Sequence, residues 1–226
     1  MLGTVAPTPY DLRFSLFGIP VRVHPLFWLV SAIMGWGGAG GDLKLVALWI
    51  ACVFVSILIH ELGHAWTAKS YGWPPHIVLY AFGGYASYQP TWGHSTGKTI
   101  LVLFAGPGAG FIFYAFIVAF EKVLDYQGIE LTALAQDVIS DLKWINLGWG
   151  LFNLLPVYPL DGGQISHAAL SHFFPRSGSA TALKISLVVA VGIAAIAFSG
   201  HQTYIALLFG SLAFENFQML QRPRYW

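Results

Sequence analysis

The strongest constraint on the fold is an apolar run that leads directly into a metal-binding motif. Residues 45–59 contain no charged side chain, and His60-Glu61-Leu62-Gly63-His64 follows without a break. Two histidines four positions apart on a helix project from one face, about one turn apart, and can share one metal ion. The glutamate beside the first histidine is the usual general base of a zinc hydrolase. The sequence therefore predicts metal-dependent hydrolysis inside a lipid bilayer rather than in water.

The composition supports a membrane location. Only 9% of the 226 residues are charged, against roughly 25% in ordinary soluble domains, and 56% are hydrophobic. A soluble chain of this length could not cover its surface with 11 basic and 10 acidic residues. The net charge of +1 argues against a nucleic-acid partner, which would require a basic patch. The single cysteine, Cys52, excludes an internal disulfide and is expected to be a packing residue.

The hydropathy pattern predicts an all-α polytopic membrane protein with about six transmembrane helices and a small β-hairpin or sheet at the cytoplasmic side. The first apolar stretch barely spans a bilayer of about 30 Å, so a short, bent or mobile helix is expected there. The whole chain, 1–226, is expected to form one domain with a core at about 43–175 and no appended soluble domain. The expected spans are about 25–36, 43–71, 97–120, a fourth beginning near 144, 182–199 and 202–219.

The sequence predicts four smaller features. Residues 14–23 suggest a short interfacial strand, and residues 76–90 suggest a β-hairpin that turns at Gly83-Gly84. Such a hairpin could offer a free edge to an extended peptide. In the third span, Gly106 and Gly110 should allow close helix packing and Pro107 should kink the helix. The acidic stretch 121–143 is expected to be an aqueous loop with a short amphipathic helix at 130–142.

A second motif follows the fourth span, where Asn153 precedes two prolines and Asp161-Gly162-Gly163. Prolines and glycines here predict broken helix at membrane depth, which is tolerated where it lines a buried site. An aspartate at that depth is costly unless it is paired or bound to metal. With six spans, eight basic residues fall on one side and three on the other, which predicts that both termini are cytoplasmic. His60, His64 and Asp161 would then all lie on the cytoplasmic side of the membrane and could meet.

A catalytic zinc takes three protein ligands and keeps one position for water. Asp161 is the acidic residue expected at the depth of His60 and His64, because Glu215 lies closer to the interface. The alternative is two core histidines hydrogen-bonded to one another and to Glu61, which would leave Asp161 unexplained. The other histidines are expected to have interfacial, solvated or structural roles; they are His24, His76, His94, His167, His172 and His201.

The motif at 60–64, followed by Asn153-x-x-Pro156 and Asp161-Gly162, resembles the site-2 protease family of intramembrane zinc metalloproteases. The resemblance covers residues about 15–175 in order, including Phe82-Gly83-Gly84 and Ala105-Gly106-Pro107. It implies a Zn²⁺ cofactor held by His60, His64 and Asp161. It also implies that Glu61 is the catalytic base and that Asn153 helps to position the substrate or the oxyanion. Gly110 stands where many members have an asparagine, and no PDZ or CBS domain is expected.

The resemblance implies regulated intramembrane proteolysis, in which a peptide bond within or near a transmembrane helix of a membrane protein is hydrolysed. The implied partners are a transmembrane protein substrate and the lipid bilayer, in a bacterial or archaeal cytoplasmic membrane. Two other classes of function remain open at this point. A catalytically silent relative would act as a binding partner, although the intact Glu61 speaks against it. A metal transporter would spread its ligands over both leaflets, whereas these residues cluster at one end.

Overall fold

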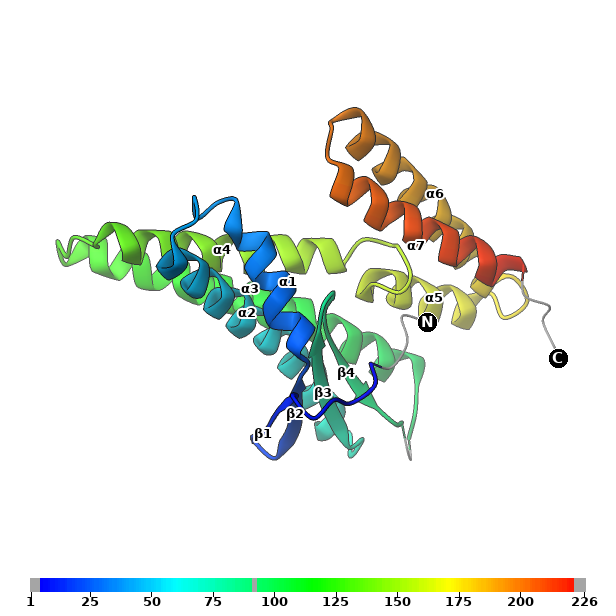
Figure 1. The fold of residues 1–226 in the computed structure, drawn as a ribbon. Coiled ribbons are helices and arrows are strands. Elements are labelled where there is room, and N and C mark those ends of the chain that lie inside the picture. Colours follow the sequence, from blue (N-terminus) through cyan, green and yellow to red (C-terminus); the bar gives the residue numbers. More distant parts are fainter. Residues whose placement is uncertain (1–4, 91–92, 222–226) are drawn as a thin grey trace. The chain divides into compact units, whose positions relative to one another are not determined.

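A computed structural model describes residues 5–90 and 93–221 of the chain, and within these ranges it contains seven helices and four strands (Figure 1). The chain divides into two compact units. The first consists of residues 1–93 and 105–151, and the second of residues 94–104 and 152–226. The fold is therefore mostly helical with one small sheet, as the hydropathy pattern predicts.

The sheet belongs to the first unit and has the strand order β1-β2-β3-β4, with β1 (Leu12–Leu16), β2 (Ile19–Val23), β3 (Pro75–Tyr80) and β4 (Gly83–Tyr88). The predicted strand at 14–23 is thus a hairpin, β1–β2, and β2 pairs in parallel with β3. Alternate β2 residues point into the core because side chains alternate across a strand. Ile19, Val21 and Val23 are each at most 2% exposed, and they pack with Phe27, Ile57 and Ala65.

The predicted hairpin at 76–90 is confirmed as β3–β4, but its predicted turn is wrong. Tyr80 pairs with Gly83, so Ala81-Phe82 forms the two-residue turn and the glycines begin β4. Two physical reasons favour glycine at the start of β4: Gly83 has a φ of 115°, and neither glycine has room for a side chain. A Cβ on Gly83 would lie 2.6 Å from Cζ2 of Trp149, and a Cβ on Gly84 would lie 2.7 Å from Cγ of Glu61.

The first four helices along the chain are α1 (Pro25–Trp36), α2 (Leu43–Ser70), α3 (Thr96–Tyr126) and α4 (Ala133–Asn153). His24 caps α1, because its Nδ1 accepts a hydrogen bond from the Leu26 amide at 3.2 Å. Asp42 caps α2 in the same way through the Lys44 amide at 2.8 Å. α2 ends at Ser70 and is followed by the cap residue Tyr71 and by Gly72. The φ of Gly72 is 77°, a value that suits glycine.

The acidic stretch 121–143 is more helical than predicted. α3 continues to Tyr126, and α4 runs without a break from Ala133 to Asn153, so the predicted short helix and the start of the fourth span are one element. The Lys143 ammonium lies 2.6 Å from Glu121 Oε2 and joins the two helices. This pair accommodates two of the charges that, in the sequence, suggest an aqueous loop.

The second unit contains α5 (Asp161–Phe173), α6 (Gly178–Ser199) and α7 (Thr203–Gln221). The ranges of α6 and α7 agree with the spans predicted at 182–199 and 202–219, and the two helices run side by side (Figure 1). Their core centres on Val157, which precedes α5 and has no exposed surface. Around it pack Ala190, Phe209, Leu212 and Ala213.

Three helices in the described part of the chain are long and apolar enough to cross a membrane, namely α2, α3 and α6, and α1 is a shorter apolar helix. This finding agrees with a membrane protein, but it does not confirm about six transmembrane helices. Arg222 and Arg224, which contribute to the charge bias, lie outside the described residues.

Close packing of α2 on α3 yields a stability prediction. A Cβ on Gly63 would overlap the Ala105 carbonyl and approach the Ala109 methyl at 2.9 Å, so Gly63→Ala must push the helices apart. Overpacking of this kind costs about 1–3 kcal/mol. We expect Gly63→Ala to lower the apparent Tm of the metal-free protein in detergent by several degrees. Gly192→Ala is the control, because a Cβ there meets nothing within 4 Å; equal melting of both variants would contradict the packing argument.

Candidate metal centre

The candidate metal centre begins with His60 and His64 on α2, which are 3% and 6% exposed. Their Nε2 atoms lie 3.2 Å apart, and the ring centroids are 4.9 Å apart with the rings nearly perpendicular. A four-residue helical spacing brings the two rings to one face of α2, as the sequence predicts. Both nitrogens are therefore directed toward one small region.

This arrangement fits a zinc ion. Zinc binds imidazole nitrogen at about 2.0–2.1 Å in tetrahedral geometry, which separates two ligand nitrogens by roughly 3.3–3.4 Å. The observed 3.2 Å is close to that value. A hydrogen bond between two neutral imidazoles would have a similar length, so a measurement of bound metal has to separate the two interpretations.

A glycine on α3 leaves room for the His64 ring. A Cβ on Gly106 would overlap the Nε2 end of the ring, so no other residue fits there without displacing the imidazole. The close helix packing predicted for Gly106 is thus confirmed, and its consequence is direct contact with a candidate ligand. Gly110, one turn later, lies beside Asn146, whose carbonyl oxygen would be 3.4 Å from a Cβ.

Asn146 also links α4 to α2. Its Nδ2 donates to Ser56 Oγ at 2.9 Å and to the Leu142 carbonyl at 2.8 Å, and both side chains are 2% exposed. Ser56 lies one helical turn before His60. A buried hydrogen bond next to the histidine pair therefore fixes α2 against α4.

Glu61 is 3% exposed and lies against the backbone of β4. A Cβ on Gly84 would be 2.9 Å from Glu61 Oε1, so the carboxylate and the strand are in direct contact. Trp149 covers the neighbouring Gly83. The candidate base thus lies at the beginning of an edge strand. The sequence predicts the hairpin but not this contact with Glu61.

Asn153 and Asp161 belong to the second unit and are each 8% exposed. Asn153 is the last residue of α4, and Asp161 is the first residue of α5. The broken helix predicted between them is confirmed. A Cβ on Gly162 or Gly163 would overlap the backbone of residues 154–158, so these glycines let the loop fold tightly onto the start of α5.

The loop before Asp161 is held at Tyr158 by two buried side chains from other helices. The Tyr158 amide donates to Ser186 Oγ on α6 at 3.1 Å. Asn216 Nδ2 on α7 donates to the Tyr158 carbonyl at 2.7 Å. Ser186 and Asn216 are 1% and 0% exposed. Both backbone polar groups of Tyr158, which belong to two successive peptide bonds, are therefore fixed three residues before Asp161.

Ser186 and Asn216 support the site but belong to no motif in the sequence. A signal was available, because each is a polar residue within or beside apolar helical sequence, where such residues usually bond to a neighbouring element. Their partner is a backbone peptide in a loop, and helical periodicity does not predict contacts of that kind.

His60 and His64 in the first unit, and Asp161 in the second, each have one ligand atom to offer to a metal ion. Two imidazoles and a carboxylate are a donor set that catalytic zinc accepts. All three side chains are buried, and a buried carboxylate requires compensation of this type.

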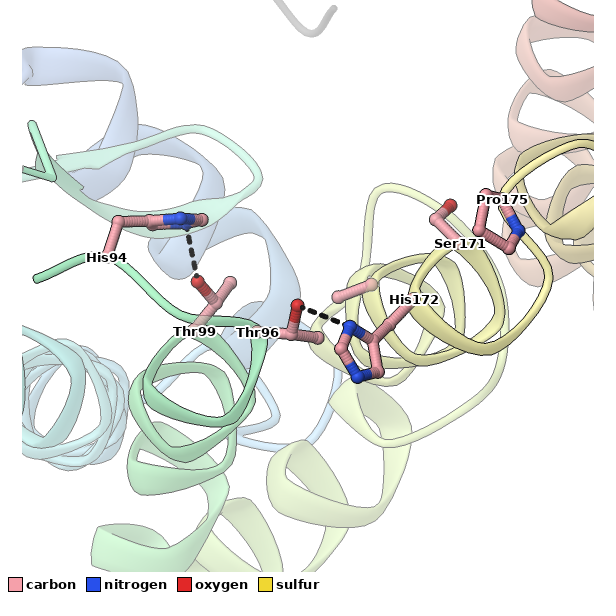
Figure 2. A pocket seen from close by; sticks show the side chains of 7 residues that line it. His94, Thr96, Thr99, Ser171, His172 and Pro175 are labelled. Atoms are coloured by element: carbon pink, nitrogen blue, oxygen red, sulfur yellow. Dashed lines mark hydrogen bonds between the residues drawn. The ribbon is translucent and has the colours of Figure 1, made fainter.

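Three of the other histidines, His94, His167 and His172, lie near hydroxyl groups. Burial lowers the pKa of His167, which lies 2.9 Å from Ser179 Oγ through its Nε2. His94 and His172 line an open cavity of about 510 Å³ in the second unit (Figure 2). There Thr99 Oγ1 lies 3.1 Å from His94 Nε2, and Thr96 Oγ1 lies 3.4 Å from His172 Nδ1. In Figure 2 a threonine hydroxyl group faces each of these two rings.

The sequence model of peptidase family M50 matches residues 48–137 and 122–197. Among curated proteins, a zinc metalloprotease of Methanocaldococcus jannaschii is 31% identical over 207 residues, which cover 90% of this chain and 55% of the relative. Stage IV sporulation protein FB of Bacillus subtilis is 28% identical over 160 residues, or 70% of this chain and 50% of the relative. The chain thus spans about half the length of these curated relatives.

A solved structure, the site-2 protease from Methanocaldococcus jannaschii, matches with a TM-score of 0.65 and 26% sequence identity. The match covers 96% of this chain and 98% of that chain. The match therefore extends over almost the whole of both chains.

The contact between Gly106 and His64 predicts a loss of metal affinity. Gly106→Ala should displace the imidazole and weaken zinc binding by roughly 10- to 100-fold, the range found when groups that support a ligand are changed. Competition with a chromophoric chelator measures this affinity. Gly148→Ala on α4 is the control, because a Cβ there meets nothing within 4 Å. Unchanged affinity in Gly106→Ala would show that His64 does not bind the metal.

The two hydrogen bonds to the Tyr158 backbone predict that Ser186, which is distant in the sequence, supports Asp161. Ser186→Ala would leave the buried Tyr158 amide without its acceptor, at a cost of about 1–3 kcal/mol. We expect faster hydrogen exchange in a peptide covering residues 155–160 of the metal-free protein, together with weaker zinc binding. Ser211→Ala, at an exposed position of α7, should change neither. Faster exchange with unchanged zinc affinity would separate the loop from the metal site.

Proposed function

The chain belongs to peptidase family M50, and on this premise we propose that it is an intramembrane zinc metalloprotease. It hydrolyses a peptide bond within or near a transmembrane helix of a membrane-protein substrate. The observation that carries the proposal is the buried His60–His64 pair on a helix of membrane length, with Glu61 held against an edge strand. Metal ligands, a base and a place for an extended peptide are what such a reaction requires.

We assign the zinc ligands as His60, His64 and Asp161. The 3.2 Å separation of the imidazole nitrogens, the burial of the carboxylate and the backbone hold on its loop support this assignment. Relatives named zinc metalloproteases support the choice of metal. When bound, zinc supplies a Lewis acid that makes water acidic enough to react near neutral pH and polarises the substrate carbonyl.

Glu61 is assigned as the general base. Its carboxylate accepts the proton of the attacking water and delivers it to the amide nitrogen as the C–N bond breaks. Apolar surroundings strengthen such a proton transfer, because few solvent molecules compete for the carboxylate. Asn153, buried at the end of α4, is the candidate donor to the oxyanion that develops on the carbonyl oxygen.

The β4 edge is assigned to the substrate. A transmembrane helix hides its carbonyl groups in intrahelical hydrogen bonds, so it must unwind locally before hydrolysis. β4 is the last strand in the order β1-β2-β3-β4 and can pair with an extended segment. Because Gly84 touches Glu61, a segment paired beside this end of β4 would bring its carbonyl groups toward the base.

For the membrane, we propose about six crossings with both termini and the small sheet on the cytoplasmic side. The three membrane-length helices and the apolar α1 support four of these crossings. The length of α7 and the apolar second half of α4 support the others. The excess of lysine and arginine on one side supports the orientation, and relatives from an archaeon and a bacterium support a prokaryotic cytoplasmic membrane.

We further propose that residues 1–226 act as a single metalloprotease domain with its core at about 43–175. The family match, which extends over 48–197, supports this proposal because it includes parts of both compact units. All the residues assigned to catalysis and metal binding fall inside that match.

Replacement of the base separates metal binding from catalysis. We expect Glu61→Gln to keep one equivalent of zinc and to slow cleavage of a co-expressed membrane substrate by roughly a hundredfold to ten-thousandfold, the usual contribution of general acid–base catalysis. Membrane proteomics of cells that carry the wild type or the variant would identify fragments that depend on Glu61. Glu130→Gln is the matched control, since Glu130 is exposed in the loop between α3 and α4.

The same experiment tests the other classes of function. Cleavage retained in Glu61→Gln would contradict the assignment of the base. A wild-type protein that binds zinc and produces no fragment in any membrane would instead favour a silent binding partner. Zinc bound at several equivalents, with uptake into vesicles, would favour a transporter.

A further inference from the structure

A bulky aromatic residue occupies a strained position at the tip of the β1–β2 hairpin. Leu16 pairs with Ile19, so Phe17-Gly18 is a two-residue turn, with φ of 52° at Phe17 and 70° at Gly18. Asparagine followed by glycine is the usual solution for such a turn, and positive φ is unfavourable for a bulky residue. Phe17 is nevertheless 62% exposed, so burial in the protein core does not compensate for the strain.

The tip contacts the end of α2 through two side chains. The Phe17 and Trp66 rings are 5.1 Å apart and tilted by 41°. The Lys69 ammonium donates to the Phe17 carbonyl at 2.7 Å. Trp66 is itself 54% exposed, so the two rings together form an apolar surface bordered by a cation.

The position of this surface along α2 sets its depth in a bilayer. Lys44 and Lys69 are the outermost charges of α2 and are separated by about 37 Å at 1.5 Å per residue. A hydrocarbon core of about 30 Å fits between them and leaves a few ångströms at each end. Trp66 therefore falls at the boundary between the acyl chains and the headgroups, and Phe17, which touches it, lies at the same depth.

The surface also continues the lipid-facing side of α2. Val55 and Trp66 are eleven residues apart, which returns to nearly the same face of a helix, and both are exposed, at 39% and 54%. Ile59 and Leu62 lie between them on this face and are partly exposed. The Phe17–Trp66 surface continues this exposed side toward the end of α2, so it should contact the bilayer interface.

From these observations we propose that Phe17 and Trp66 form an interfacial membrane anchor. Both rings insert at the boundary of the acyl chains and the phospholipid headgroups, where aromatic side chains are favoured, and Lys69 extends toward the headgroup phosphates. The anchor attaches the sheet to the bilayer at a second point beside α2. Contact with lipid offsets the strain at Phe17, which explains why an aromatic residue occupies a turn that suits asparagine.

Site-directed spin labelling tests the anchor in the intact protein. Cys52 is the only cysteine, so Cys52→Ser provides a background for single labels. Nitroxides are attached to Phe17→Cys and Trp66→Cys in vesicles of phosphatidylcholine and phosphatidylglycerol. The control is Arg13→Cys on the same hairpin, where the side chain is 62% exposed and lies about 13 Å along the strand from the tip.

Power saturation with oxygen and with a water-soluble nickel chelate then reports the depth of each label. We expect the ratio of oxygen to nickel accessibility to be several-fold higher at positions 17 and 66 than at position 13. Nickel accessibility at position 17 equal to that at position 13 would overturn the anchor. Low accessibility to both reagents at position 17 would also overturn it and would indicate a protein partner or a second copy. Position 66 keeps the test valid if Phe17→Cys distorts the turn.

Discussion

The structure depends most on the close approach of two imidazoles inside apolar sequence. Two polar rings buried on a membrane-length helix would be costly without a common partner, and their nitrogens, 3.2 Å apart, are directed to one point. Several neighbouring glycines are explained by the need to leave space around the two rings. Gly106 leaves space for one ring, and Gly63 lets α2 approach α3 closely enough for that contact to occur. Small residues on α2 and α3 therefore shape the candidate metal centre, although they offer no ligand atom.

The Asp161 carboxylate is positioned differently, through hydrogen bonds to the backbone of the loop that precedes it. Helices α6 and α7 contribute Ser186 and Asn216, which bind the amide and the carbonyl of Tyr158 and so fix the loop before Asp161. Val157, which has no exposed surface, anchors the same loop in the core formed by these helices. A displacement of α6 or α7 would therefore move the backbone that carries Asp161. Helices outside the expected core of the domain can in this way affect the chemistry without contributing a ligand.

The sequence predicted the parts of this molecule that are governed by local patterns. The apolar runs gave the extents of α2, α6 and α7 within a few residues, and the spacing of His60 and His64 gave the pair. Features decided by contacts between distant segments were missed or misplaced. Gly83-Gly84 has the composition of a turn, yet it begins β4, where Gly83 has a φ of 115° and Trp149 and Glu61 leave no room for a Cβ. The parallel pairing of β2 with β3 joins segments more than fifty residues apart, which no local pattern records.

The His60–His64 motif lies near one end of α2, where both water and lipid are accessible. Hydrolysis needs water, whereas the expected substrate segment is stable only in lipid, and both are accessible close to the membrane interface. His64 lies five residues before Lys69, or about 8 Å along the helix, so the pair is within reach of the headgroup region. The sheet carries the hairpin tip at Phe17 and, two strands away, the β4 edge beside Glu61. An anchor at Phe17 would then determine how far the β4 edge stands from the lipid, and hence where along a membrane helix a segment can unwind onto it.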